Sequence, residues 1–245
     1  MKSKSILITG ANSGIGREVF LKSLEKGYFA IAAIRNPSDF LKEITDSGID
    51  KNKFLAIELH LDSQNSVDSF PKRLKELNKS LDYLVLNAGY IETSSVLMTT
   101  TESLKNHMMI NFFSQINLIQ SLTKAYFIKK RSGSIVAVSS SAAIDANAGR
   151  LAYASSKSAL ATALRVCSKE LGKINIRCNI VAPGLTNTKL MKNSTEQEQI
   201  DIFINNLSIK RIGNPEEIAN VILFLCEDES SFITGQIISV DGGIR

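Results

Sequence analysis

Short apolar runs alternate with amphipathic stretches along the whole chain, and this alternation constrains the fold more than any other feature. The apolar runs are rich in Ile, Val, Leu and Phe, as in buried strands, and the stretches between them follow the period of an amphipathic helix. We expect strands at 5–9, 29–34, 54–59, 82–86, 135–138, 176–181 and 236–240, and helices at 17–26, 66–78, 101–129, 152–171 and after residue 214. The alternation predicts the α/β class, with a doubly wound parallel sheet and helices on both faces.

The length of the chain fits this fold as one unit. With 245 residues it can bury a sizeable core, and no linker or repeat divides it, so we expect a single domain over 1–245. Apolar residues make up 44% and charged residues 22%, which indicates an ordinary globular protein. The net charge of +5 includes only one short basic run, 129–131, and therefore predicts no nucleic-acid surface.

Cysteine usage and hydropathy indicate the compartment. Cys167, Cys178 and Cys226 stand singly, without metal-binding spacing, and are odd in number, so we expect free thiols in a reducing compartment. No apolar stretch reaches the roughly 18 residues that a membrane helix needs, and the apolar run 6–8 is too short for a signal peptide. We therefore expect a cytoplasmic protein without a membrane partner.

A glycine-rich turn joins the first expected strand to the first expected helix. It reads Gly10-Ala-Asn-Ser-Gly14-Ile-Gly16, a Gly-x-x-x-Gly-x-Gly spacing instead of the commoner Gly-x-Gly-x-x-Gly. Glycines between a strand and a helix allow backbone N–H groups to approach a pyrophosphate at the positive end of the helix. A plain connecting turn is the alternative. The turn predicts a dinucleotide site that includes Gly10, Asn12, Ser13, Gly14, Ile15 and Gly16.

The end of the second expected strand indicates which dinucleotide would bind. An NAD site places an acidic residue about 20 residues past the glycines, and here Ile34 and Arg35 occupy that place, with Asp39 in the next helix. A guanidinium suits a 2′-phosphate through bidentate, charge-assisted bonds. A solvated arginine at a strand end is the alternative. We therefore expect NADP(H) in preference to NAD(H).

The third and fourth expected strands each end in residues suited to a bound ligand. Asp62 either accepts a hydrogen bond from an adenine amino group or caps the next helix. The small residues of Asn87-Ala88-Gly89 allow a ligand to pass close to the backbone. His60 and His107 have no partners that suggest a metal or a catalytic triad, so we interpret both as structural and expect no metal site.

The fifth expected strand ends in three serines, and a helix with Tyr153 and Lys157 follows. These two residues are four apart and share one helix face. A free tyrosine has a pKa of about 10, and an ammonium about 4 Å away favours the ionised phenol by about 4 kcal/mol at an effective dielectric of 20. The pair therefore suggests a tuned acid. A surface lysine one turn after a half-buried tyrosine is also common, so the surrounding motifs decide between the two.

Two further segments carry polar residues in unusual places. Asn111 lies inside the long helix 101–129 among apolar residues and needs partners if buried, either for structure or for function. Pro183-Gly184 breaks the sixth strand, and 185–212 then reads as a polar lid around one short helix that begins with a capping box, Thr195-x-x-Glu198.

Together these motifs resemble the short-chain dehydrogenase/reductase family over the whole chain. The matching pieces are Thr9–Gly16, Asp62, Asn87-Ala88-Gly89, Asn111, Ser140, Tyr153-x-x-x-Lys157, Pro183-Gly184 and Thr188. Among the three adjacent serines, the resemblance indicates Ser140, thirteen residues before Tyr153, as the serine of the family motif. Ser139 is the second choice. It implies a Rossmann-type sheet of seven strands, usually in a homotetramer.

The resemblance also implies roles in the reduction of a ketone to a secondary alcohol. Tyr153 would give its proton to the carbonyl oxygen, and Ser140 would hydrogen-bond that oxygen. Lys157 would lower the pKa of Tyr153 and bind the nicotinamide ribose, and Asn111 would hold a water that links Lys157 to solvent. The cofactor residues would include Pro183, Gly184, Thr186 and Thr188, although Thr186 stands where an aliphatic residue is usual.

Within the family the chain is most similar to 3-oxoacyl-acyl-carrier-protein reductases of fatty acid biosynthesis, which implies a carrier-linked 3-oxoacyl substrate. The basic helix ends 129–131, Lys169 and Lys173 would steer the acidic carrier, or they simply complement the helix dipoles. A sugar, nucleotide sugar, polyol or other small alcohol is the alternative substrate. A third possible function is that of a non-catalytic dinucleotide-binding sensor. Such sensors have usually lost the tyrosine or the lysine, and this sequence contains both.

Overall fold

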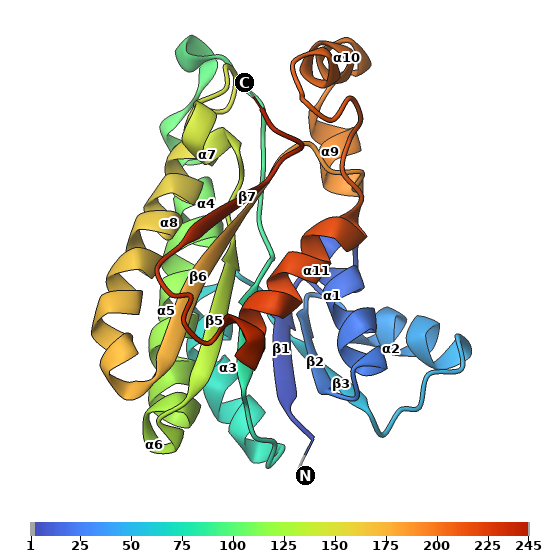
Figure 1. The fold of residues 1–245 in the computed structure, drawn as a ribbon, viewed down its shortest axis with the longest axis vertical. Helices are drawn as coiled ribbons and strands as arrows, with labels where there is room; N and C mark the ends of the chain where they lie inside the picture. The colour runs from blue at the N-terminus through green and yellow to red at the C-terminus, as the bar shows by residue number, and fades with distance from the viewer. Residues whose placement is uncertain (1–2, 245) are drawn as a thin grey trace.

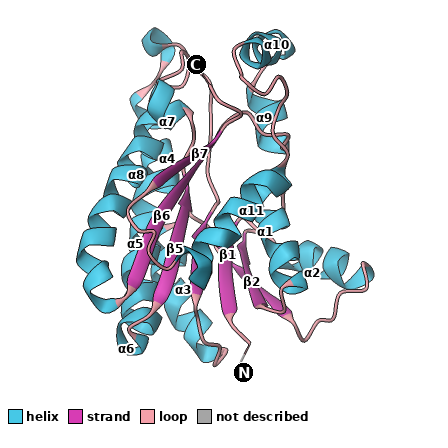
Figure 2. Cartoon of the chain, viewed as in Figure 1, coloured by secondary structure: helices cyan, strands magenta, loops and turns pink. Residues whose placement is uncertain are grey.

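The computed structural model describes residues 3–244 and contains one parallel sheet of seven strands in the order β3-β2-β1-β4-β5-β6-β7. The strands are β1 Ser5–Thr9, β2 Phe29–Ile34, β3 Phe54–Glu58, β4 Tyr83–Leu86, β5 Gly133–Val138, β6 Ile176–Pro183 and β7 Ile237–Val240. Helices cover both faces of this sheet (Figures 1 and 2). The expected Rossmann-type architecture is therefore confirmed, with strand boundaries that shift by one or two residues.

The two faces of the sheet carry different sets of helices. One face is covered by α1 Gly14–Glu25, α2 Pro37–Asp46 and α11 Pro215–Cys226, and the other by α3 Gln64–Glu76, a long helical segment from Thr101 to Lys130 and α8 Leu151–Leu171. Successive residues of β1 pack against opposite helical layers, because side chains alternate between the two faces of a strand. Ile6 and Ile8 pack into the cluster beneath α1, whereas Leu7 packs into the cluster beneath α8.

The long helical segment is one continuous rod with two wider turns. It runs through α4 Thr101–Met108, a π-turn Met109–Phe113, α5 Ser114–Leu122, a second π-turn Thr123–Phe127 and α6 Ile128–Lys130. Single π-turns within helices often lie at functional sites because they rotate the side chains that follow. The first of these turns contains Asn111, which the sequence singled out.

The lid differs from its prediction. It contains two helices, α9 Lys189–Ser194 and α10 Gln197–Asn205, and both lie beyond the carboxyl edge of the sheet (Figure 1). The expected capping box is wrong, because the residue that caps α10 is Glu196 and the Thr195 hydroxyl instead accepts a hydrogen bond from Arg150. A short helix, α7 Ala142–Asp145, also forms between β5 and α8, where the sequence predicted no helix.

The remaining short helices connect these layers. They are the 3₁₀ turns η1 Val96–Met98, η4 Gly172–Ile174 and η5 Asp228–Ser230. No helix within the described residues is long and apolar enough to cross a membrane. The strand order reverses between β1 and β4, and in open α/β sheets a ligand binds at the carboxyl ends of the strands beside such a point.

Candidate active site

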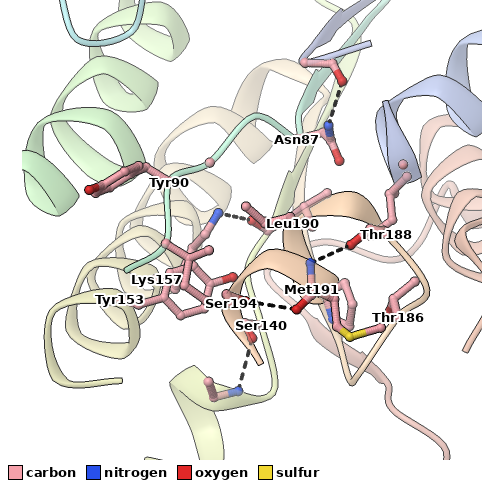
Figure 3. A pocket seen from close by; sticks show the side chains of 18 of the residues that line it. Asn87, Tyr90, Ser140, Tyr153, Lys157, Thr186, Thr188, Leu190, Met191 and Ser194 are labelled. Carbon is pink, nitrogen blue, oxygen red and sulfur yellow. Dashed lines mark hydrogen bonds between the residues drawn. The ribbon is translucent and has the colours of Figure 1, made fainter. Parts of the chain in front are cut away.

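A cavity of about 830 Å³ opens at this reversal point and extends beneath the lid. One end is lined by the glycine turn, Arg35 and Asp62, and the other end by lid residues such as Met191 and Phe203. Tyr153 and Lys157 lie between the two ends (Figure 3). The lining includes every cofactor and catalytic residue expected from the sequence except Gly16 and Asn111, which stand directly behind it.

The glycine turn is held tightly against the end of β4. A Cβ on Gly16 would lie 2.3 Å from the Gly10 carbonyl oxygen, so only glycine fits there. The Asn87 side-chain amide donates hydrogen bonds to the carbonyls of Thr9 at 3.0 Å and Gly10 at 3.3 Å (Figure 3). Because α1 begins at Gly14, three residues earlier than expected, the turn runs straight into a helix N-terminus. This cradle fits a pyrophosphate.

The adenosine end of the cavity has one cation and one acid. The cap of α3 is Ser63, whose hydroxyl accepts from the Ser66 N–H at 3.3 Å, so the Asp62 carboxylate is not the helix cap and stays in the lining. Arg35 is exposed in the lining and forms no ion pair within the described residues. Asp39 is held by the Asn36 side chain at 2.8 Å. The arrangement leaves the guanidinium available to a ligand.

Tyr153 and Ser140 form the polar centre of the cavity (Figure 3). Burial raises the pKa of Tyr153, while the Ser140 hydroxyl and the Arg150 charge lower it in part. Ser139 is turned away, because its hydroxyl donates to the Lys157 backbone carbonyl at 3.2 Å. The structure therefore favours Ser140 over Ser139 as the partner of Tyr153.

Lys157 is buried beside Tyr153, and its ammonium donates to the Val138 carbonyl at 2.8 Å. Burial lowers the pKa of Lys157 to about 8. The expectation that Lys157 lowers the pKa of Tyr153 stays a prediction. In this arrangement the groups that lower the pKa of Tyr153 are Ser140 and Arg150, and the Lys157 ammonium contacts a strand-end carbonyl.

Asn111 is buried, and both the oxygen and the nitrogen of its side-chain amide have hydrogen-bond partners. Its oxygen accepts from the Tyr90 N–H at 2.8 Å, and its nitrogen donates to the Tyr90 carbonyl at 2.8 Å and to the Ser156 hydroxyl at 3.0 Å. A Cβ on Gly89 would lie 3.1 Å from the Lys157 ammonium and 3.3 Å from the Asn111 oxygen, which brings the three residues together. Asn111 thus fixes the loop after β4 next to Lys157.

The segment after β6 uses its polar side chains to shape the wall of the cavity. The Thr186 hydroxyl donates to the Gly184 carbonyl at 3.0 Å, and the Thr188 hydroxyl caps α9 by accepting from the Met191 N–H at 3.1 Å (Figure 3). A Cβ on Gly184 would lie 2.7 Å from Asp241 Cα, so the chain passes too closely for a larger residue.

The two histidines have structural partners. His60 pairs with Glu58 at 2.8 Å. His107 is buried, accepts from the Glu92 N–H at 3.1 Å and shares a 2.7 Å hydrogen bond with the Ser103 carbonyl, which fixes its proton on Nδ1. These contacts support the structural interpretation of both residues.

Several lining residues were not identified from the sequence. The lid contributes the apolar side chains of Leu190, Met191, Ile202 and Phe203 beside polar ones such as Asn193 and Gln199, and Arg150 contributes a guanidinium. Arg150 precedes Tyr153 by three residues, so the helical spacing that related Tyr153 to Lys157 was a usable signal for it as well.

The fold and this site define a nicotinamide-dinucleotide-dependent oxidoreductase. A family model described as enoyl-(acyl carrier protein) reductase matches residues 10–245. The chain belongs to the short-chain dehydrogenase/reductase family, as its sequence motifs indicated.

Relatives and solved structures cover the chain almost completely. The 3-oxoacyl-[acyl-carrier-protein] reductase FabG of Thermotoga maritima is 34% identical, over 100% of this chain and 98% of its own length. The 2,3-dihydro-2,3-dihydroxybenzoate dehydrogenase of Bacillus subtilis is 30% identical, over 99% and 96% of the two chains. A 4-hydroxyisoleucine dehydrogenase solved in complex with NADH has a TM-score of 0.90 at 28% identity and 98% coverage of both chains.

Proposed function

We propose that this enzyme is an NADP(H)-dependent ketoreductase that reduces a 3-oxoacyl thioester carried on an acyl carrier protein. The observation that carries the proposal is the position of Tyr153 and Ser140, which lie in one cavity between a dinucleotide cradle and a lid that contributes several apolar side chains. Full-length similarity to 3-oxoacyl-carrier reductases supports the substrate class.

The residues of the cavity have distinct parts in this reaction. A bound nicotinamide supplies the hydride. The Tyr153 hydroxyl gives its proton to the ketone oxygen, and Ser140 orients that oxygen by a hydrogen bond. Lys157 binds the nicotinamide ribose, and Asn111 places a water that returns a proton to Lys157 and Tyr153 from solvent. The closeness of Lys157 and Asn111 to Gly89 supports this relay.

NADP(H) is the proposed cofactor because Arg35 lines the adenosine end without an acidic partner in the described chain. A guanidinium there favours a 2′-phosphate. The remaining proposed cofactor contacts are Gly10, Asn12, Ser13, Gly14, Ile15, Gly16, Asp62, Asn87, Ala88, Gly89, Tyr153, Lys157, Pro183, Gly184, Thr186 and Thr188.

A small alcohol is the second candidate substrate, favoured by the similarity to the Bacillus subtilis dehydrogenase. The apolar lid side chains Leu190, Met191 and Phe203 suit an acyl chain, whereas polar lid residues in the same lining, such as Asn193 and Gln199, suit a hydroxylated substrate. A sensor without catalysis is disfavoured because the Ser140, Tyr153 and Lys157 side chains gather at one point.

We also propose a homotetramer in a reducing, cytoplasmic compartment. Exposed apolar residues occur on the outer side of both helical layers, with Phe113 and Val166 on one and Phe224 on the other, and Ile237 is exposed on edge strand β7. Two apolar faces on different sides support two kinds of subunit contact, as in a D2 tetramer. The three free cysteines support the compartment.

A substrate panel tests the proposal. Purified enzyme is offered a 3-oxoacyl carrier thioester, the matching free thioester, a simple ketone, sugars and polyols, with oxidation of NADPH or reduction of NADP followed by absorbance. A 2-enoyl thioester is included because of the description of the matching family model. We expect the highest kcat/KM with the carrier-linked 3-oxoacyl group and NADPH. Activity confined to an alcohol or polyol would support the second candidate instead.

A further inference from the structure

The Arg150 guanidinium connects three segments that are distant in the sequence. It donates to the Thr93 hydroxyl at 2.6 Å, in the loop that follows β4. It also donates to the Ser194 carbonyl at 2.8 Å and to the Thr195 hydroxyl at 2.9 Å, both at the end of α9 in the lid. Arg150 itself immediately precedes α8. One side chain therefore ties the lid to the loop after β4 and to the helix that carries Tyr153.

Neighbouring contacts strengthen the same junction. The Thr93 hydroxyl donates to the Ser194 carbonyl at 3.0 Å, so this carbonyl accepts from both Thr93 and Arg150. The Ser94 N–H donates to the Gly149 carbonyl at 3.0 Å, which fixes the loop after β4 against the chain that leads into α8. The Ser194 carbonyl ends a helix and lacks a partner within it, which makes it a strong site for a charged donor.

The Arg150 guanidinium lies where hydrogen bonds within the protein replace part of its contact with water. It is half-buried, it lines the cavity, and it forms no ion pair with a carboxylate within the described residues. Burial lowers the pKa of Arg150, and a guanidinium keeps its charge in proteins. A half-buried cation that is not paired with an acid must be held by hydrogen bonds, and all three of these go to the junction.

We propose that Arg150 is a positioning residue that holds the lid, residues 185–212, closed over the substrate end of the cavity. Closure places Met191 and Phe203 in the same cavity as Tyr153, and the lid thereby sets how tightly an acyl chain is held. The proposal rests on the proposed function in one respect, because it takes the lid as the wall of the substrate-binding end of the cavity. A closed lid also excludes water from the reacting carbonyl.

The test compares three variants with the wild type, all saturated with NADPH. Arg150→Met removes the donors but keeps an aliphatic side chain. The double variant Thr93→Val with Thr195→Val removes two acceptors and keeps the charge. Arg150→Lys restores a charged donor without the planar fork. Arg165→Met, an exposed arginine on the same helix, is the matched control.

Two readouts separate a lid role from other roles. The first is the rate of tryptic cleavage after Lys189 and Lys192 in the lid, which requires no substrate. The second is the division of any loss between KM and kcat. We expect Arg150→Met and the threonine double variant each to accelerate lid cleavage at least fivefold and to raise the substrate KM at least tenfold. Arg150→Lys should be intermediate, and Arg165→Met should match the wild type.

Specific results would overturn the inference. Wild-type cleavage rates in both Arg150→Met and the threonine double variant would show that the junction does not hold the lid. A raised KM in Arg150→Met with unchanged cleavage would assign the guanidinium to direct contact with the substrate. If no 3-oxoacyl thioester is reduced by the wild type, the proposed function fails, whereas the cleavage assay still decides the role of Arg150.

Discussion

At the scale of single residues, Tyr153 is the group whose loss is easiest to interpret. Tyr153→Phe removes the transferable proton and keeps the ring, so turnover should fall at least about 10²-fold while cofactor binding persists. Steady-state kinetics and a fluorescence titration with NADPH measure the two effects. Tyr90→Phe is the matched control, because Tyr90 also lines the cavity but its hydroxyl donates, within the described residues, only to Glu92, at 3.4 Å. Near-normal turnover of Tyr153→Phe would rule out the assignment of the acid.

The buried ammonium of Lys157 makes stability depend on pH. Its pKa is lowered from 10.5 to about 8 by burial. Below pH 8 the group is protonated in both states, and between pH 8 and 10.5 only the unfolded state keeps the proton. Stability therefore rises with pH in this window. The difference in unfolding free energy, Lys157→Met minus wild type, should fall by about 1–2 kcal/mol from pH 7 to pH 9.5.

Urea denaturation of the cofactor-free protein across this pH range measures the Lys157 effect, with both proteins at one concentration. Taking the difference between variant and wild type removes the titration of other groups. A difference that stays constant with pH would show that Lys157 is as easily protonated in the folded chain as in the unfolded one.

Arg35 is the residue on which the choice of cofactor depends. Arg35→Ala should weaken the use of NADPH by roughly 1.5–3 kcal/mol, the contribution of a hydrogen bond to a charged group, and leave the use of NADH nearly unchanged. The ratio of kcat/KM for the two cofactors measures this. Arg17→Ala is a suitable control, because Arg17 is paired with Glu43 at 2.8 Å and does not line the cavity. A wild type that prefers NADH would contradict the proposal.

At the scale of elements, the glycine turn combines cofactor binding with folding. A Cβ on Gly16 would meet the Gly10 carbonyl oxygen at 2.3 Å and the Asn87 amide at 2.4 Å. Gly16→Ala should therefore cost about 1–3 kcal/mol of stability through overpacking and weaken NADPH binding as the cradle shifts. Gly172→Ala is the control, because its Cβ would meet no atom within 4 Å and its φ is −57°. Calorimetry and equilibrium titration measure both variants.

The two glycines should change stability in opposite directions. Gly172→Ala should leave stability unchanged or raise it by up to about 1 kcal/mol, since it mainly restricts the unfolded chain. Equal stability and equal NADPH affinity in Gly16→Ala and wild type would show that the turn can expand without cost.

The elements differ in how far the sequence could predict them. Strands such as β1 and β2 were predicted to the residue, because buried apolar runs between glycine, proline and polar residues have few alternatives. The lid was predicted with one helix too few, since the hydroxyl of Thr195 has two possible partners, a helix N-terminus or Arg150. That choice depends on a residue 45 positions away, which no local pattern reports.

The sequence indicated which residues line the site, but it did not indicate the hydrogen bonds that these residues form. Ser140, Tyr153 and Lys157 gather as the motifs indicated. The tertiary contact of Lys157 with the Val138 carbonyl, and the π-turn that turns Asn111 toward Tyr90, arise only when the strands and helices pack. The same packing buries the Lys157 ammonium, which lowers its pKa, and sets the position of the loop after β4.

At the scale of the whole molecule, the basic helix ends and the catalytic cavity lie at opposite edges of the sheet. Gly133 pairs with Ile176, so the segments that precede β5 and β6 end side by side and bring Lys129 near Lys173. Tyr153 lies at the other end of α8, about 24 Å from Lys169 along the helix. A carrier docked at this basic surface would therefore lie about one helix length from the cavity of the same chain.

The carrier proposal makes the last prediction. Lys129 and Lys173 are exposed, whereas Lys130 is paired with Asp82, so the first two are the cations to change. Lys129→Glu with Lys173→Glu should raise the KM for the carrier-linked substrate and leave the KM for the free thioester unchanged. The effect should be stronger at low salt, because screening weakens attraction between exposed charges.

A double variant with the same change in net charge separates local docking from overall charge. Lys51→Glu with Lys75→Glu alters two exposed lysines on other parts of the surface. If the basic surface steers the carrier, only the change at Lys129 and Lys173 raises KM, with sedimentation of the two variants unchanged. Equal effects of both variants would assign the loss to net charge. Equal effects on carrier-linked and free substrates would show that the cations complement the helix dipoles and have no part in docking.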